Sequence, residues 1–176
     1  MKKGFANEVN KTERKYLPEF VYGGIDGSVT TFAIVAVAIG ASLSSAVILI
    51  LGFANLFADG FSMAISNYMS TKSRNELSKK KDKHPTKAAL ATFFSFLIIG
   101  FIPLISFVLA SFIPSLSQNK FLYSFILTGI ALFIVGLVKG EVVRKHPLKS
   151  ALETLVVGGI AAALAYLVGY LLRGLV

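Results

Sequence analysis

The chain has 176 residues, of which 55% are hydrophobic and 15% are charged, and its mean hydropathy is +0.71. Soluble domains carry about 25% charged residues, so this composition predicts an integral membrane protein that folds as one unit. The net charge is +9, but the basic residues fall between apolar stretches, where membrane topology explains them, and nucleic acid is not an expected partner. The chain has no cysteine, which excludes disulfides, thiolate metal sites and thiol catalysis.

Residues 1–19 are polar and charged and lack the apolar core of a removable signal peptide, so we expect a cytosolic lead-in. Five apolar stretches follow, each long enough to cross about 30 Å of hydrocarbon as a helix. The predicted fold is all-α, with five membrane spans in one domain of residues 20–176. The expected spans cover residues 20–41, 46–69, 88–113, 121–138 and 151–172, and basic loops cover residues 70–87 and 139–150.

Lysine and arginine are distributed unevenly along the chain. Of the 18 basic residues, all but Lys120 and Arg173 fall in the lead-in and the two basic loops. Loops rich in Lys and Arg stay on the cytosolic side of a membrane. The N-terminus is therefore expected in the cytosol, and five spans place the C-terminus outside the cell or in a lumen.

The second expected span carries a polar stripe within an apolar sequence. Asn55, Asp59, Met63 and Asn67 recur at every fourth residue, so a helix places them on one face. A carboxylate in hydrocarbon costs several kcal/mol unless it is paired, and the stripe has no basic side chain. We expect the partner of Asp59 to be a cation that binds and leaves.

These residue types suit a divalent transition metal. Fe²⁺ and Mn²⁺ accept oxygen ligands, and the softer metals also accept thioether sulfur. Asp26 and Thr30 on the first expected span complete the set. Metal binding requires ionised carboxylates and releases protons, so an acid that exchanges a proton for a metal, open to each side in turn, is a metal/proton antiporter. The candidate metal ligands are Asp26, Thr30, Asn55, Asp59, Met63 and Asn67.

Two other functions use the same residues. A membrane scaffold or assembly protein would use Asp59 as a hydrogen-bonded link between helices, and a passive cation channel would use the stripe without proton coupling. Gly23 and Gly27 form a small-residue pair that permits close helix packing. The sequence has no phosphate-binding glycine loop, nucleophile elbow or HExxH motif, so we expect neither an enzyme nor a resident cofactor.

Similar sequences, Lys83-His84-Pro85 and Lys145-His146-Pro147, lie just before the third and fifth expected spans. Proline favours the first turn of a helix, and lysine extends to the membrane interface. We interpret both as helix starts; the alternative is a pair of histidines that captures metal. The repetition also suggests that spans two and three and spans four and five are related hairpins.

Three segments resemble the vacuolar iron transporter family. Tyr22 to Ala36 reads Y-G-G-I-D-G-S-V-T-T-F-A-I-V-A, and Leu51 to Ser73 reads L-G-F-A-N-L-F-A-D-G-F-S-M-A-I-S-N-Y-M-S-T-K-S. Ser150 to Gly169 reads S-A-L-E-T-L-V-V-G-G-I-A-A-A-L-A-Y-L-V-G. These are similar to the first, second and last spans of that family.

The resemblance implies a five-span homodimer with an ion path near the two-fold axis, between the first and second spans. It implies proton-coupled export of cytosolic Fe²⁺, sometimes Mn²⁺, across the vacuolar membrane of a eukaryote or the cell (inner) membrane of a prokaryote. By position, Asp26 would be the conducting acid and Met63 the thioether ligand. The implied partners are the metal ion, protons, membrane lipid and a second copy of the chain.

The sequence departs from the family pattern in two ways. Some eukaryotic members have Glu at the position of Asn55, whereas this chain has Asp59 one turn further on. Those members also insert a long, Glu-rich cytosolic helical domain between spans two and three. The corresponding segment here is the short basic loop, so the chain resembles a short form whose loop repels free cations.

Overall fold

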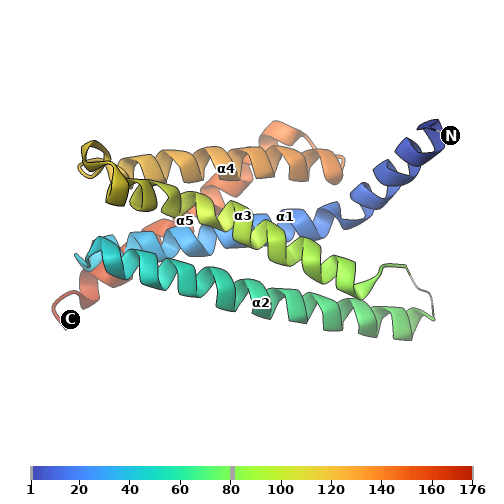
Figure 1. The fold of residues 1–176 in the computed structure, drawn as a ribbon, viewed down its shortest axis with the longest axis horizontal. Helices are drawn as coiled ribbons and strands as arrows, with labels where there is room; N and C mark the ends of the chain where they lie inside the picture. The colour runs from blue at the N-terminus through green and yellow to red at the C-terminus, as the bar shows by residue number, and fades with distance from the viewer. Residues whose placement is uncertain (1, 80–81, 176) are drawn as a thin grey trace.

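The computed structural model describes the backbone of residues 2–79 and 82–175 and the side chains from residue 15 onward. The described residues form helices and no strands, as predicted (Figure 1). The helices are α1 (Lys2–Gly40), α2 (Ser45–Ser78), α3 (Pro85–Phe112), the short 3-10 helix η1 (Pro114–Leu116), α4 (Lys120–Val142) and α5 (Pro147–Leu172).

Within the described residues, five helices are long and apolar enough to cross a membrane, and in α1 this stretch is Lys15–Gly40. The chain is a multi-pass membrane protein. Successive helices run in opposite directions (Figure 1). The α2–α3 and α4–α5 turns therefore share one end of the bundle, which we call the basic end because Lys83 and Lys145 lie there.

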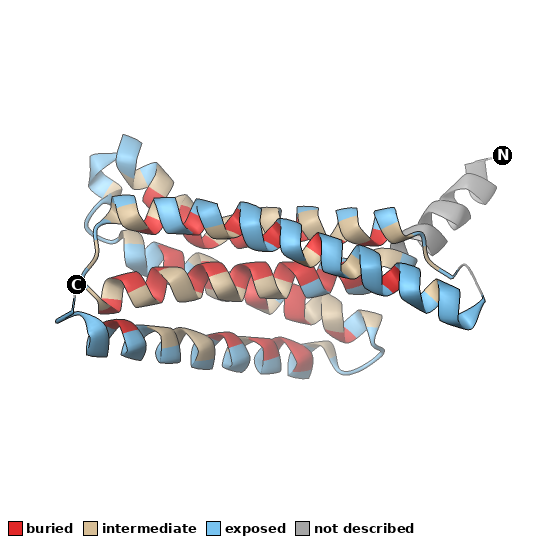
Figure 2. Ribbon diagram, turned by 90° about the horizontal axis from the view of Figure 1, so that it is seen from below, coloured by how far each residue is buried: buried red, intermediate tan, exposed pale blue. Residues whose placement is uncertain are grey.

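Helix α1 lies at the centre of the bundle and packs against the four other long helices. Buried residues concentrate on the faces that the helices turn toward one another (Figure 2). A Cβ on Gly27 would lie 2.5 Å from the Phe96 carbonyl oxygen of α3, and one on Gly100 would lie 2.8 Å from the Gly27 carbonyl oxygen. Only glycine permits this approach, so the predicted close packing at the small-residue pair is confirmed.

Helix α2 lies at the edge of the bundle and buries only a narrow stripe. Gly52 and Gly60 of this stripe face Leu104 and Phe96 of α3. The rest of α2 is largely exposed in a single chain, and this exposed surface includes Asp59. From Ile48 to Ala64, the buried residues of α2 recur at every fourth position and are Ile48, Gly52, Leu56, Gly60 and Ala64.

The two Lys-His-Pro sequences are helix starts, as predicted. His84 and His146 are the N-cap residues of α3 and α5, and Pro85 and Pro147 occupy the first turn. Neither histidine side chain caps its helix. Proline suits this position because the first N–H groups of a helix have no intrahelical partner.

Candidate functional site

The facing sides of α1 and α2 carry the predicted polar residues nearest the middle of the bundle. The Thr30 hydroxyl donates to the carbonyl oxygen of Asp26, one turn earlier, at 2.7 Å. The Asn55 amide of α2 donates to the Thr30 hydroxyl oxygen at 3.5 Å. Thr30 and Asn55 therefore link the two helices beside the half-buried Asp26.

The two predicted acids lie on neighbouring helices, Asp26 on α1 and Asp59 on α2. Asp26 is half-buried, whereas Asp59 is exposed in a single chain. Neither forms an ion pair with any side chain that the structure describes. Two carboxylates near each other disfavour the doubly ionised state unless a proton or a cation is shared between them.

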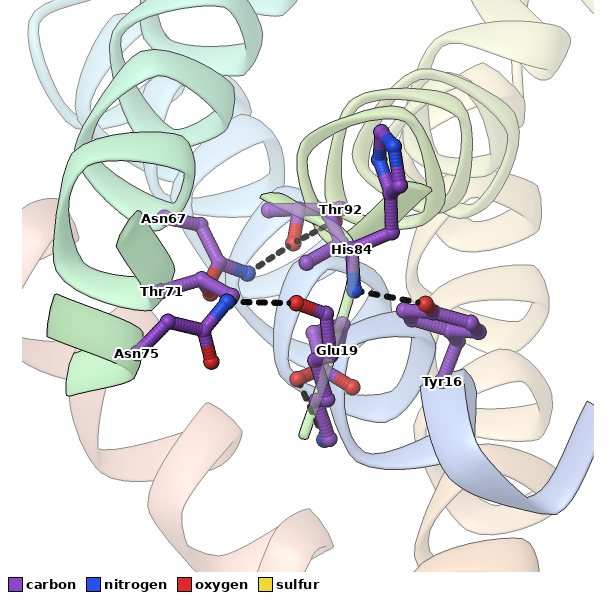
Figure 3. Close-up of polar contacts among 9 residues, drawn as sticks. Tyr16, Glu19, Asn67, Thr71, Asn75, His84 and Thr92 are labelled. Carbon is purple, nitrogen blue, oxygen red and sulfur yellow. Dashed lines mark hydrogen bonds and ion pairs between the residues drawn. The ribbon is translucent and has the colours of Figure 1, made fainter. Parts of the chain in front are cut away.

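The remaining stripe residues face different neighbours. Met63 is half-buried and packs against the hydrophobic core. The Asn67 amide donates to the Thr92 hydroxyl of α3 at 2.6 Å, and its oxygen accepts from Thr71 at 3.3 Å (Figure 3). Four residues rotate a helix about 40° beyond a full turn, so a stripe drifts by about 120° over twelve residues. This drift explains why Asn55 faces α1 whereas Asn67 faces α3.

A cavity of about 450 Å³ opens between α1 and α2 toward the basic end. Met63 connects it to the predicted stripe, since its side chain lines one wall. Hydroxyl groups from one face of α2 line the rest of that wall. The lining residues are Pro18, Glu19 and Tyr22 from α1 and Ser62, Met63, Ser66, Asn67 and Ser70 from α2.

Glu19, expected in the cytosolic lead-in, is a cavity residue that the sequence did not predict. Glu19 is 8% exposed, and its Oε1 lies 2.6 Å from Lys83 Nζ of the α2–α3 turn. The spacing of the acids could have identified Glu19, because it precedes Asp26 by seven residues and a helix places both on one face. Nothing in the sequence identifies Lys83 as its partner, because Lys83 is distant along the chain and resembles the other loop lysines.

The turn that carries Lys83 is held by both neighbouring helices (Figure 3). The Asn75 amide of α2 donates to the Lys83 carbonyl oxygen at 2.7 Å. The His84 backbone N–H donates to the Tyr16 hydroxyl oxygen of α1 at 2.9 Å. These contacts fix the backbone of the turn beside the cavity. The described residues contain no group of three or more His, Cys, Asp or Glu that could hold a metal.

The VIT family model matches residues 17–84 and 76–170. This chain belongs to the VIT family. The family resemblance drawn from its spans is therefore confirmed. The two matched parts overlap at residues 76–84, which cover the end of α2 and the α2–α3 turn.

This VIT-family chain is similar to several curated proteins over most of its length. It is 28% identical to the vacuolar iron transporter of Toxoplasma gondii, covering 92% of this chain and 76% of the relative. It is 28% identical to the vacuolar iron transporter of Plasmodium berghei (94% and 85% covered) and 24% identical to vacuolar iron transporter 1 of Arabidopsis thaliana (90% and 87%). The first alignment extends over 229 residues, more than the 176 present here, so that relative contains residues that this chain lacks.

Proposed function

We propose that this VIT-family chain is a proton-coupled transporter that exports a divalent transition metal, Fe²⁺ and also Mn²⁺, from the cytosol into a vacuole. The observation that carries the proposal is an acid on each of two packed membrane-spanning helices, Asp26 on α1 and Asp59 on α2, neither of which is ion-paired with a described side chain. The relatives named vacuolar iron transporters support the substrate and the membrane.

The proposed metal site lies between α1 and α2. A divalent cation there removes the repulsion between the two carboxylates, and Thr30 and Asn55 add oxygen ligands between the helices. Met63 supplies sulfur toward the cavity, and Asn67 joins through the second lone pair of its amide oxygen. Protons replace the metal when it leaves, because the two acids cannot both remain charged at low cost.

A second copy of the chain completes the proposed site. On α2, Asp59 and Ser62 are exposed beside Phe57 and Phe61, which are 61% and 62% exposed. Hydrocarbon accepts the phenylalanines but not the carboxylate. A homodimer packed on this face would cover Asp59 and add a second pair of acids. The positive-inside rule places the basic end in the cytosol, so metal enters through the cavity there.

The test is metal uptake into proteoliposomes that contain a pH-sensitive dye. We expect Fe²⁺ and Mn²⁺ to enter while protons move in the opposite direction, and Asp59→Ala and Asp26→Ala to abolish both fluxes. Glu153→Gln is the matched control, because this exposed acid lies in the second turn of α5, outside the α1–α2 site. Metal entry without proton movement would indicate a channel. Absence of flux in folded protein, or full flux in both alanine variants, would overturn the proposal.

A further inference from the structure

We propose that Glu19 is the loading site for the metal at the basic end, and that Lys83 occupies it as a built-in competitor until a divalent cation displaces its ammonium group. The inference rests on the proposed transport function and deepens it. It starts from Glu19, which is almost fully buried and ion-paired through Oε1 only. Oε2 is also buried and accepts no hydrogen bond from the part of the chain that the structure describes. A buried carboxylate oxygen without a partner is costly, so it marks a position where a further cation is stabilised.

The cavity beside Glu19 has the size and lining that a partly hydrated cation needs. A metal with six waters occupies about 180 Å³, since each water takes about 30 Å³, and the cavity offers about 450 Å³. Ser62, Ser66 and Ser70 supply hydroxyl oxygens and Met63 supplies sulfur on the opposite wall. These groups suit a divalent transition metal better than an organic cation.

Glu19 and Asp26 are successive positions along one helix face. Seven residues of α-helix separate them by about 10 Å along the axis. Met63 lines the cavity at Glu19 and also belongs to the stripe that contains Asp59. A cation bound at Glu19 therefore lies next to the proposed metal site rather than at an unrelated surface.

The side chain of Lys83 can move away from Glu19 without unfolding the α2–α3 turn. Its backbone is anchored through the Asn75 and Tyr16 hydrogen bonds, while its side chain is 24% exposed and ends in a flexible ammonium group. A divalent cation at the same distance from Glu19 attracts it about twice as strongly as the single charge of lysine. It also repels the ammonium group toward solvent.

The other Lys-His-Pro sequence shows that the ion pair is not required to start a helix. Lys145 occupies the same place before α5, is exposed, and forms no ion pair with a described side chain. The α5 helix nevertheless begins at Pro147 as α3 begins at Pro85. The contact between Lys83 and Glu19 thus serves something other than helix initiation.

The experiment measures Mn²⁺ binding to the purified full chain in lipid nanodiscs, by loss of the free-Mn²⁺ electron paramagnetic resonance signal. We expect Lys83→Met to bind Mn²⁺ about tenfold more tightly than the unmodified chain, and Glu19→Gln/Lys83→Met to lose this gain. Lys145→Met is the matched control and should leave affinity unchanged. Unchanged or weaker binding by folded Lys83→Met would overturn the inference.

A second variant keeps the test decisive if Lys83→Met does not fold. Lys83→Arg retains a cation that binds carboxylates with two parallel hydrogen bonds, so we expect it to weaken Mn²⁺ binding severalfold. Tighter binding by Lys83→Arg would contradict the competitor role. If these affinities change as expected but proteoliposomes show no flux, the loading site stands and the transport function fails. If proteoliposomes show flux but these affinities do not change, the transport function stands and the loading site fails.

Discussion

The turns before α3 and α5 begin their helices in the same way. Each contains Lys-His-Pro, and in each the histidine carbonyl accepts the first helical hydrogen bond, from Ala88 at 3.1 Å and from Ser150 at 3.1 Å. In each, the chain leaves the preceding helix through a residue with positive φ, Lys79 at 52° and Arg144 at 53°. Local sequence therefore produces the same local structure twice.

The two turns differ in what holds them. The α4–α5 turn is closed by its own backbone: the Lys145 N–H donates to the Gly140 carbonyl at 2.9 Å, and Gly140 packs against Pro147. The α2–α3 turn is held by side chains of other helices, through Tyr16 and Glu19 of α1. One turn is an ordinary connection, whereas the other joins a loop cation to the cavity between α1 and α2.

The largest loss of stability is expected from a substitution that disrupts the backbone packing of the α4–α5 turn. A Cβ on Gly140 would lie 2.5 Å from the Cα of Pro147, so Gly140→Ala should destabilise the protein by about 1–3 kcal/mol and lower its Tm by several degrees. Gly129→Ala in the same helix meets open space and should leave Tm unchanged or slightly higher. Circular dichroism melts in detergent measure both. Equal melting of the two variants would contradict this account of the α4–α5 turn.

The second-largest loss of stability is expected when the cation of the α2–α3 turn, Lys83, is removed. Lys83→Met leaves the buried Glu19 carboxylate unpaired, and because Lys83 is partly exposed the expected destabilisation is about 1–2 kcal/mol. We expect Mn²⁺ to restore the Tm of this variant but not that of Glu19→Gln/Lys83→Met. Melts with and without Mn²⁺ test this. Restoration in both variants would show that the metal acts elsewhere.

A smaller effect concerns the hydrogen bond at His84. Tyr16→Phe removes the acceptor of the His84 N–H and should destabilise the protein by about 1 kcal/mol. Tyr170→Phe is the control, because its ring rather than its hydroxyl lies against the Arg173 guanidinium. Hydrogen–deuterium exchange should increase in the α2–α3 turn of the first variant only. Increased exchange at α5 instead would refute the assignment.

The smallest effect is expected at the counterpart lysine. Lys145→Met changes an exposed residue without an ion-pair partner among the described side chains, so its stability should change by less than about 0.5 kcal/mol. The same melts measure it. A loss equal to that of Lys83→Met would show that the two turns are equivalent after all.

Much of the candidate site could be predicted because it depends on helical spacing. Helical spacing predicts that Asn55 lies on the polar face of α2, and its amide donates to the Thr30 hydroxyl of α1 in the structure. The direction of Asn67 could not be predicted in the same way, since its neighbours depend on the rotation of α2 against α3. The metal-ligand roles themselves stay predictions.

Sequence by itself determined the five apolar helices, the proline starts of α3 and α5, and the family, because length, hydropathy and the first helical turn are local properties. Only the tertiary structure decided which charges meet. Glu19 and Lys83 are 64 residues apart, and nothing in the local pattern distinguishes Lys83 from Lys145. The packing of α1 against α3 through Gly27 and Gly100 brings the start of α3 beside Glu19. Because Glu19 is buried there, leaving its carboxylate without a cationic partner costs free energy.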